Sequence, residues 1–531
     1  MKKLTFCILV SILLTSCNNF LDEYSTDLRY CETAQDLEYL MIGEAFLNTP
    51  SLSIYSQSTM TKSNLEGLVS SYNYPWLNVM DDDAEVFVWD YVSTDMGTPL
   101  YMLSGLHNWS ISPLMDVLSK KWEDTQWEKM YKKIGALNSI IFQAEQLSDK
   151  KGVDHNLLSH IGGEAYFLRA YYYFYLNNIY GLPYSKTTAS SDFGVPLKTS
   201  EVIEVKYFSR ATNEAVFNQI VSDLEHAANY LHGYTPNTKL RVGIGAVKAL
   251  QSRVYLYMEK YDEAIKAAEE FDNLSYALLD LNTVAPKTNI TYRSSKETIF
   301  TVGGNEVPAV FMNDSLSSWD GNDNRVSAFK ASSNLMDKYQ TGDLRLKTFF
   351  YSSSKNRAPI PEKYKTWKTY NDPEVVSSVF AIRYPEVILN HAEALAMLGK
   401  TDDARQAIEK LRTKRFASAI MSDVPSTEKE LVTFIRDERR RELCFEGHRW
   451  FDLRRYAVNS KYPLENNFVI RHPSYSYDAN SKMNYLSGYF ELESYGKDKA
   501  AWVVPVPDYV ISYNRGSIKN LERKTRNLIK K

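Results

Sequence analysis

Two stretches rich in aromatic and polar residues contain the side chains best suited to binding a small ligand. They cover residues 50–120 and 276–380, are largely without regular periodicity, and contain many Tyr, Trp, Ser and Asn residues. Flat aromatic rings stack on the C–H faces of sugars or on peptide side chains, while Asp and Asn orient the ligand by hydrogen bonds. We expect the two stretches to meet on one face, with ligand contacts from Trp76, Trp89, Tyr91, Trp109, Tyr292 and Trp319. For each ring taken alone, packing of its loop onto the protein core is the competing interpretation.

Three consecutive aspartates in the first stretch, Asp81, Asp82 and Asp83, are candidates for a metal site. Clustered carboxylate oxygens are the ligands that calcium requires. Acidic runs of this kind are more often solvated loops, and that interpretation stands beside the first. Calcium is the one cofactor that the sequence suggests.

The sequence contains no recognisable catalytic motif. His-Glu-x-x-His, Gly-x-Ser-x-Gly, the phosphate-binding Walker loop and the dinucleotide fingerprint are all absent from it. These motifs therefore give no positive sign of an enzyme. A surface glycoside hydrolase remains an alternative, because its paired carboxylates are brought together in space and not by sequence spacing.

The first 17 residues have the features of a lipoprotein leader. Lys2 and Lys3 precede an apolar run from Leu4 to Leu14, which is too short to span a bilayer. Leu14-Thr-Ser-Cys17 then resembles a bacterial lipobox, which implies that Cys17 is lipidated and becomes the first residue of the mature chain. Acyl chains would hold a soluble body at the membrane, since each buried CH₂ contributes roughly 0.8 kcal/mol. An ordinary signal peptide followed by a chance cysteine is the alternative.

The charge and cysteine content exclude two other classes of protein. With 62 basic and 65 acidic side chains, the net charge is −3. Nucleic acid is therefore not an expected partner, because its phosphates attract a positive excess. Apart from Cys7 in the leader and Cys17, the chain has Cys31 and Cys444. One disulfide between them is compatible with the sequence, but the chain is not a disulfide-stabilised scaffold.

Apolar residues at helical spacing predict a scaffold of helix pairs that positions the two irregular stretches. Helices are expected over residues 33–43, 122–147, 157–180, 216–231, 245–258, 262–271 and 427–445. A second helix-pair pattern runs from Glu386 to Ala404 and continues to Ile408 and Leu411. The pairs beginning at Gly245 and Glu386 resemble tetratricopeptide repeats, in which small Ala residues let two helices approach closely. Because a long irregular stretch separates the pairs, we expect a helical scaffold with a large insertion and not a continuous solenoid. Within the insertion, residues 297–302 are predicted to form a buried strand.

The segment from Arg436 to Arg455 combines many arginines with many acidic residues. Its apolar helical stripe continues into Glu438, Arg439 and Glu442. Charges on a buried stripe must be paired and hydrogen-bonded. A helix that binds nucleic acid would not contain so many acidic residues, so structural ion pairs are the favoured interpretation.

Three segments carry a resemblance to a known family. Glu438-Arg-Arg-Arg-Glu-Leu-Cys-Phe-Glu-Gly-His-Arg-Trp-Phe-Asp-Leu-Arg-Arg455 looks like the signature of the SusD/RagB family of outer-membrane nutrient-binding lipoproteins. Arg383-Tyr-Pro-Glu-Val-Ile-Leu-Asn-His-Ala-Glu-Ala394 and the segment from Arg169 to Pro183 are similar to further family motifs. The resemblance covers essentially the whole mature chain, which begins at Cys17 and ends beyond Val504-Pro-Val-Pro507.

The resemblance implies a mainly α fold, a single composite domain with a tetratricopeptide-like scaffold and a loop-rich ligand face. It implies a lipid-anchored outer-membrane protein, facing the cell exterior, that binds glycans and delivers them to a SusC-like TonB-dependent transporter. Such a protein binds its ligand and is not an enzyme. A peptide ligand, as in RagB, is the alternative, and a helical-repeat protein that only bridges other proteins is a third hypothesis. Asn18 and Asn19 precede Asp22-Glu23, whereas acidic residues that mark surface export usually follow the Cys closely, so the facing stays open. The expected regions are a signal peptide (1–16), a tether (17–30), an N-terminal SusD-like region (31–275) and a C-terminal SusD/RagB region (276–531).

Overall fold

The fold is mainly helical, as the sequence predicts. The computed structural model describes residues 31–48, 72–88, 98–116, 119–286, 288–311, 328–352, 359–364, 374–417 and 423–531. The leader with Cys17, and also Trp89, Tyr91 and Trp319, lie outside these residues. Among the described helices, none has the length and apolarity needed to cross a membrane.

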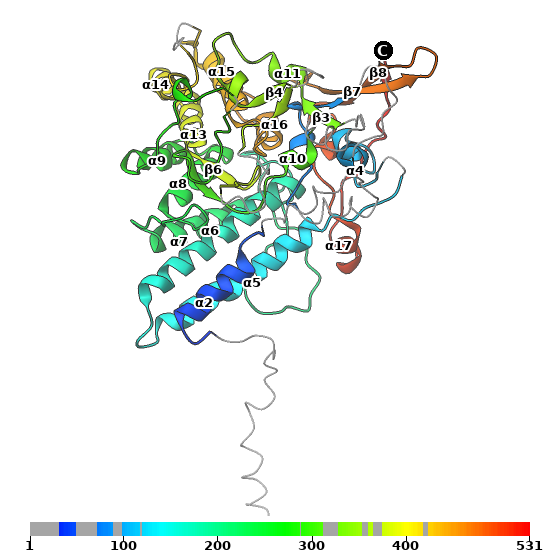
Figure 1. Cartoon of the computed structure of the whole chain (residues 1–531). Helices are drawn as coiled ribbons and strands as arrows, with labels where there is room; N and C mark the ends of the chain where they lie inside the picture. The colour runs from blue at the N-terminus through cyan, green and yellow to red at the C-terminus, as the bar shows by residue number, and fades with distance from the viewer. Residues whose placement is uncertain are drawn as a thin grey trace, which may run out of the picture.

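Long helices pack side by side into the scaffold that forms most of the molecule (Figure 1). They are α2 (Ala34–Leu40) continued by the π-helix η1 (Met41–Ala45), α5 (Gln126–Ser148), α6 (His155–Tyr180), α7 (Asn213–Tyr230), α8 (Ile244–Tyr257), α9 (Tyr261–Glu269), α13 (Tyr384–Met397), α14 (Thr401–Arg412), α15 (Glu428–Leu443) and α16 (Arg449–Ala457). Short helices lie between them: η3 (Leu77–Val79), α4 (Thr98–His107), η4 (Glu270–Asn273), η5 (Leu281–Thr283), α10 (Val307–Val310), α11 (Ser333–Met336), α12 (Arg345–Thr348), η7 (Lys499–Trp502) and α17 (Asp508–Tyr513). The predicted helices are thus confirmed to within a few residues at their ends.

Helix α6 is the centre of the scaffold because it is buried on every face. Its aromatic run from Tyr171 to Tyr175 is at most 2% exposed. Two hydroxyl groups in this run find backbone acceptors: Tyr172 donates to the carbonyl of Ala45 at 2.8 Å and Tyr173 donates to that of Lys198 at 2.8 Å. Buried tyrosines need such partners, so α6 ties the first helix and the loop after α6 to the core.

The two tetratricopeptide-like pairs lie next to each other in space. Helix α13 packs against both α8 and α9, as well as against α14 and α15. The insertion between the pairs therefore leaves the helical stack and returns to it without interrupting the stack. The expected helical scaffold with a large insertion is thus confirmed, and its two helix pairs pack against each other.

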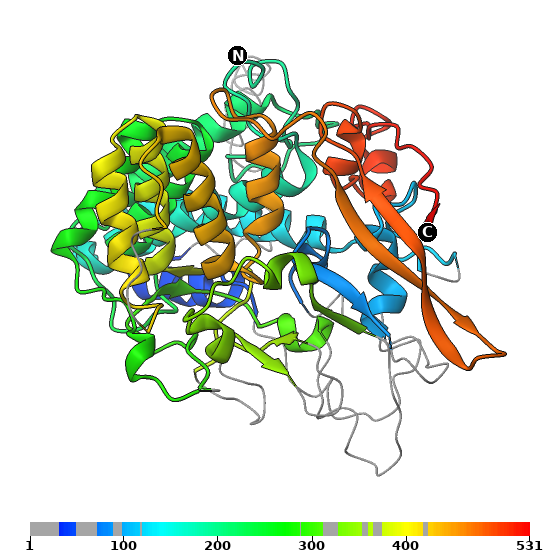
Figure 2. The same cartoon turned by 90° about the horizontal axis from the view of Figure 1, so that it is seen from above.

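The strands form small separate antiparallel sheets. They are β1 (Ala84–Phe87) with β3 (Ala328–Ala331), β2 (Thr298–Thr301) with β6 (Ala381–Arg383), β4 (Phe350–Ser352) with β5 (Pro359–Pro361), and β7 (Ile470–Asp478) with β8 (Met483–Leu492) and β9 (Ile529–Lys530). Strand β2 confirms the predicted buried strand. The hairpin β7–β8 was not predicted, and it projects from the body of the molecule in Figure 2.

The predicted ion pairs of the signature segment are confirmed. Glu438 and Glu442 on α15 are fully buried, and Arg345 contacts both of them at 2.7 and 3.2 Å. Arg415 donates two hydrogen bonds to the carboxylate of Glu442, at 2.9 and 3.0 Å. Burial opposes the charge of Glu442, but Arg415 and the neighbouring guanidinium groups outweigh it and lower its pKa to about 2. Loss of one partner from such a buried pair typically costs about 3–5 kcal/mol.

The remaining cysteines do not form a disulfide. Both Cys31 and Cys444 are free; Cys31 is half-buried near the start of α2, and Cys444 is buried directly after α15. Burial raises the pKa of the Cys444 thiol to about 11, so this thiol is protonated at neutral pH.

Candidate functional site

The pair β1–β3 brings the two aromatic stretches together. Strand β1 belongs to the first stretch and β3 to the second, and they pair from Ala84 opposite Ala331 to Phe87 opposite Ala328. Figure 2 shows the two strands side by side. Residues 89–97 begin two positions after the end of β1, and residues 312–327 directly precede β3. Along the sequence, both segments therefore adjoin the same end of one strand pair.

Tyr292 is the predicted ligand contact that is partly exposed in the described structure. It lies beside Thr291, which bridges to Tyr364, and its carbonyl accepts a hydrogen bond from the Thr298 hydroxyl at 2.7 Å. Residues 365–373 of the second stretch follow Tyr364 directly along the sequence. Tyr292 therefore lies close to the point where that segment begins. Strand β5, which ends three residues before Tyr364, also contacts β3.

Trp76 and Trp109 lie in the protein core, contrary to the prediction that they contact a ligand. Their exposed fractions are 0% and 1%. Trp76 meets the ring of Tyr74 edge-on at a centroid distance of 5.6 Å. Trp109 stacks on His472 at 4.2 Å and donates from Nε1 to the carbonyl of Met80 at 2.9 Å. These two rings pack the loop onto the body of the protein, which was the competing interpretation.

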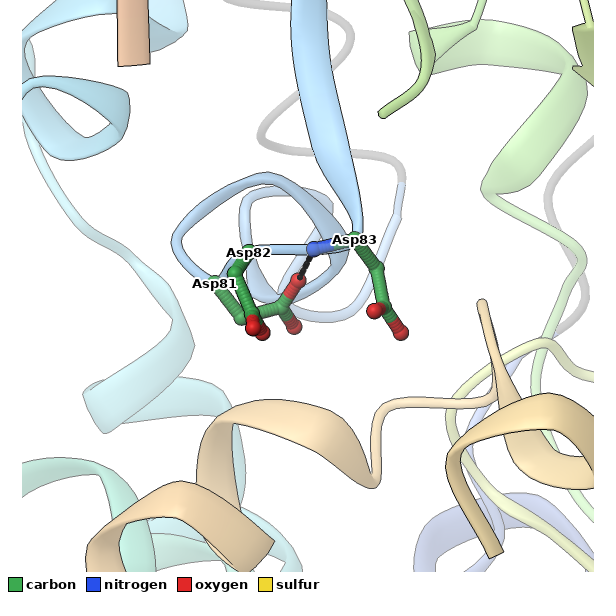
Figure 3. Close-up of side chains that lie close together, drawn as sticks. All are labelled: Asp81, Asp82 and Asp83. Carbon is green, nitrogen blue, oxygen red and sulfur yellow. Dashed lines mark hydrogen bonds between the residues drawn. The ribbon is translucent and has the colours of Figure 1, made fainter. Parts of the chain in front are cut away.

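The three aspartates form a compact turn before β1 (Figure 3). Their carboxylate oxygens include a set within 4.8 Å of one another. Oδ1 of Asp81 accepts a hydrogen bond from the backbone N–H of Asp83 at 2.9 Å, which closes the turn. Asp81 and Asp83 are 3% and 1% exposed, so the run is not the solvated loop that was the alternative to a calcium site.

Two arginines of the signature segment neutralise this turn. Arg449 binds both carboxylate oxygens of Asp82, at 2.7 and 2.9 Å, and Arg440 donates to Oδ1 of Asp83 at 2.6 Å. Burial alone would raise the pKa of Asp82, but Arg440 and Arg449 outweigh it and hold the pKa far below its usual range.

The arrangement does not fit a calcium ion. Calcium takes six to eight oxygen ligands. In this turn the guanidinium groups of Arg440 and Arg449 use three of the carboxylate oxygens and supply the compensating positive charge. The pKa of Asp81 is raised well above its usual value by burial and by the charges of Asp83 and Asp82, which disfavours the anionic form that a cation would bind. We therefore interpret the aspartates as structural partners of the signature arginines.

An open cleft of about 1090 Å³, with many charged side chains in its lining, lies beside the turn. Its lining comes from β1, α15, α16 and the segment that leads into β7, and includes seven basic and four acidic side chains. Several of these charges are already paired: Lys338 with Asp437 at 2.9 Å, for example. Of the predicted aromatic contacts that the structure describes, Trp76, Trp109 and Tyr292, none lines the cleft. Sequence analysis missed it because its walls come from segments that are far apart along the chain.

Two family models match different parts of the chain. The model described as "SusD family" matches residues 287–522. The model described as "Starch-binding associating with outer membrane" matches residues 78–256. The chain belongs to the SusD/RagB family. The strand β1, helices α5 to α8 and the signature helix α15 thus all lie in segments matched by SusD-type models.

Similar proteins agree with this assignment. "SusD-like protein P2" of Formosa agariphila is 25% identical over 403 residues, which are 67% of this chain and 75% of the relative. A putative sugar binding protein from Bacteroides vulgatus has a similar structure, with a TM-score of 0.65, 21% identity, and coverage of 93% of this chain and 99% of its own. A SusD superfamily protein from Bacteroides thetaiotaomicron has a TM-score of 0.63 at 20% identity, covering 92% and 99% of the two chains. At these identities, the two structures establish a shared fold.

Proposed function

We propose that this protein is a lipid-anchored outer-membrane protein that binds a glycan and passes it to a SusC-like TonB-dependent transporter. The observation that carries the proposal is the match of residues 78–256 to a model described as starch-binding and associating with the outer membrane. The leader that ends in Cys17 supports the lipid anchor. No catalytic role is proposed, because the site offers rings and paired charges but no motif for bond cleavage.

The proposed ligand site is the face at which the aromatic stretches adjoin β1–β3. Trp89 and Tyr91 follow β1 by two and four residues, and Trp319 precedes β3 within the paired stretch. Tyr292 is the described member of this set. The pairing of Phe87 with Ala328 supports a common site, because the segment after β1 and the segment before β3 both adjoin this end of the strand pair. Aromatic rings from two segments can enclose a sugar ring between them.

Isothermal calorimetry against a panel of oligosaccharides and peptides tests the proposal. We expect binding of at least one glycan, and an affinity loss of about tenfold or more in Trp319→Ala and in Trp89→Ala, since the stacking of a sugar on one ring contributes on the order of 1 kcal/mol or more. Tyr513→Ala, which removes a ring that is 68% exposed on α17, is the matched control. Binding of peptides alone would favour the RagB-type alternative. New reducing ends after incubation with the glycan would indicate a hydrolase.

A further inference from the structure

An exposed apolar segment lies in the connection between α6 and α7. Residues 202–207, here called the 202–207 strip, read Val-Ile-Glu-Val-Lys-Tyr. Ile203 is 77% exposed and Val205 is 101% exposed, and Val202 and Tyr207 are more than half exposed. Single exposed apolar residues are ordinary, but a contiguous group of this kind marks an interaction surface.

The backbone of the strip is also unpartnered. Of the backbone groups from Val202 to Tyr207, all within the described chain, the Val202 carbonyl alone has a hydrogen-bond partner, the Nζ of Lys198. The flanks are fixed: the N–H of Lys198 donates to the Tyr173 hydroxyl at 2.8 Å, and the N–H of Phe208 donates to Oδ1 of Asn514 at 2.8 Å. The strip is therefore held at both ends, while its other backbone donors and acceptors have no hydrogen-bond partner among the described residues.

The residue pattern of the strip is that of a strand without a partner strand. Ile203, Val205 and Tyr207 alternate with Glu204 and Lys206, which is the two-residue period of a β-strand. β-Branched and aromatic residues favour that conformation. Among the described residues, no strand pairs with this segment. An open edge with apolar side chains is a template for an extended segment of another protein.

The position of the strip indicates what kind of protein covers it. In Figure 1 the connection between α6 and α7 hangs below α5, on the same underside as the start of α2, where the described chain begins. Asn138 on α5 joins the base of the connection to the scaffold by donating to the carbonyls of Lys198 and Ser200, at 2.9 and 3.2 Å. A chain tethered through its N-terminus presents this side toward the membrane and toward any protein embedded in it.

The charges of the strip do not favour a lipid surface. Glu204 pairs with both Lys198 and Lys206, at 3.0 and 2.5 Å, so the lysines are neutralised by a carboxylate. Binding to anionic lipid headgroups relies on unpaired basic side chains. An apolar edge with internally paired charges is better suited to a protein surface, where strand pairing satisfies the free backbone groups.

We propose that the 202–207 strip docks onto the outer-membrane transporter by adding as a β-strand to an extended segment of that protein. The proposal rests on the proposed function for the identity of the partner. It assigns the contact to one segment of this chain, which is separate from the ligand site at β1–β3.

Photo-crosslinking in the outer membrane tests the docking contact. The full lipoprotein, produced together with its SusC-like transporter, would contain p-benzoylphenylalanine in place of Val205. We expect a crosslink to an extended segment of the transporter, identified by mass spectrometry. The same probe at Met483, which is 42% exposed on the projecting hairpin, is the control and should give no such crosslink. Crosslinks from position 205 only to lipid, only to a second copy of the chain, or to nothing would overturn the proposal.

A double variant separates docking from ligand binding. Ile203→Asp with Val205→Asp should reduce the amount of transporter that copurifies with the tagged lipoprotein by about tenfold or more, because it places two charges on the apolar edge. Met483→Asp should leave it unchanged. Calorimetry with the glycan should be unaffected by either change. If the wild type binds no glycan in the panel, the proposed function is refuted. If the double variant copurifies as much transporter as the wild type does, the docking surface is refuted.

Discussion

Arg440 donates from Nε to Oδ1 of Asp83 at 2.6 Å, across a sequence separation of 357 residues. This bond joins the signature helix α15 to the turn before β1. Because β1 also pairs with β3, the same contact indirectly positions both aromatic segments that adjoin β1–β3. The signature arginines thus act as structural supports of the proposed ligand face.

Replacing Arg440 with Met should destabilise the protein by about 3–5 kcal/mol, because Asp83 would lose its guanidinium partner and remain a buried, uncompensated carboxylate. Arg440 is 4% exposed, which justifies the buried-pair estimate. The measurement is urea-induced unfolding. Lys338→Met removes a lysine whose pair with Asp437 is about one-third exposed, and should cost less than about 1 kcal/mol. Equal losses in the two variants would contradict this prediction.

The buried carboxyl group of Glu306 should make stability fall as the pH rises. Glu306 is fully buried, and burial raises its pKa to about 8 despite hydrogen bonds with Ser378. The unfolded chain releases this proton near pH 4.3, whereas the folded chain retains it until about pH 8. Stability is therefore lost between these two pH values, by at most about 1.4 kcal/mol per pH unit.

Glu306→Gln should remove that dependence, since the amide does not ionise. We expect the melting temperature of the variant, relative to the wild type, to increase steadily from pH 5 to pH 8 in a thermal unfolding series. Glu409→Gln, at an exposed position on α14, is the control and should show no trend. A constant difference between variant and wild type across this range would show that Glu306 is ionised in the folded protein.

Trp76 and Trp319 should have separable roles. Trp76→Ala should lower stability by about 3–5 kcal/mol, because it leaves a cavity among buried rings. Trp319→Ala should weaken glycan binding while the melting temperature stays within about 2 °C, as for most substitutions outside the core. Calorimetry and thermal unfolding on both variants distinguish the two effects. A fully stable Trp76→Ala protein would argue against the core position of that ring.

Calcium should not stabilise the protein through the aspartate turn. A ligand that binds only the folded state raises stability by an amount that grows with its concentration, about 2.7 kcal/mol at one hundred times the dissociation constant. Since Arg440 and Arg449 already neutralise Asp82 and Asp83, we expect no change in melting temperature up to 5 mM calcium, a concentration of the order of the weakest extracellular sites. A calcium-dependent increase that disappears in Asp81→Asn would restore the metal-site hypothesis.

Cys17→Ser should release the protein from the membrane fraction. The prediction follows from the lipobox-like leader, since acyl chains on Cys17 are the sole anchor that the sequence suggests. Metabolic labelling with a palmitate analogue should mark the wild type and not the variant. Protease digestion of intact cells then tests the exterior facing: protection of the wild type would place it on the periplasmic side.

The helical scaffold was predictable because its signals are local. The apolar spacing in α5 and the stop formed by Gly181 and Pro183 after α6 depend on neighbouring residues, and the structure confirms those helices. The ion pairing of α15 was predictable for a different reason: charges on an apolar stripe must be compensated wherever the partners come from. Which partners they are, such as Arg345 and Arg415, was not predictable, because both lie in other segments of the chain.

The assignment of individual aromatic rings was less successful for a physical reason. A Trp in an irregular stretch has the same sequence signal whether it faces a ligand or packs the loop, and Trp76 and Trp109 do the latter. The acidic run shows the same limit, since Asp82 and Asp83 are paired with arginines more than 350 positions away. The open cleft beside them gave no signal in the sequence.

The sequence by itself determined the helix pairs, the leader with Cys17, and the need to pair the charges of the signature segment, since each follows from neighbouring residues or from overall composition. The tertiary structure alone decided that α8–α9 and α13–α14 form one stack and that β1 pairs with β3. It also decided that Asp82 and Asp83 form ion pairs with Arg440 and Arg449. These results depend on contacts between distant segments. Such contacts form only when the whole chain buries its apolar surface, and no local pattern encodes them.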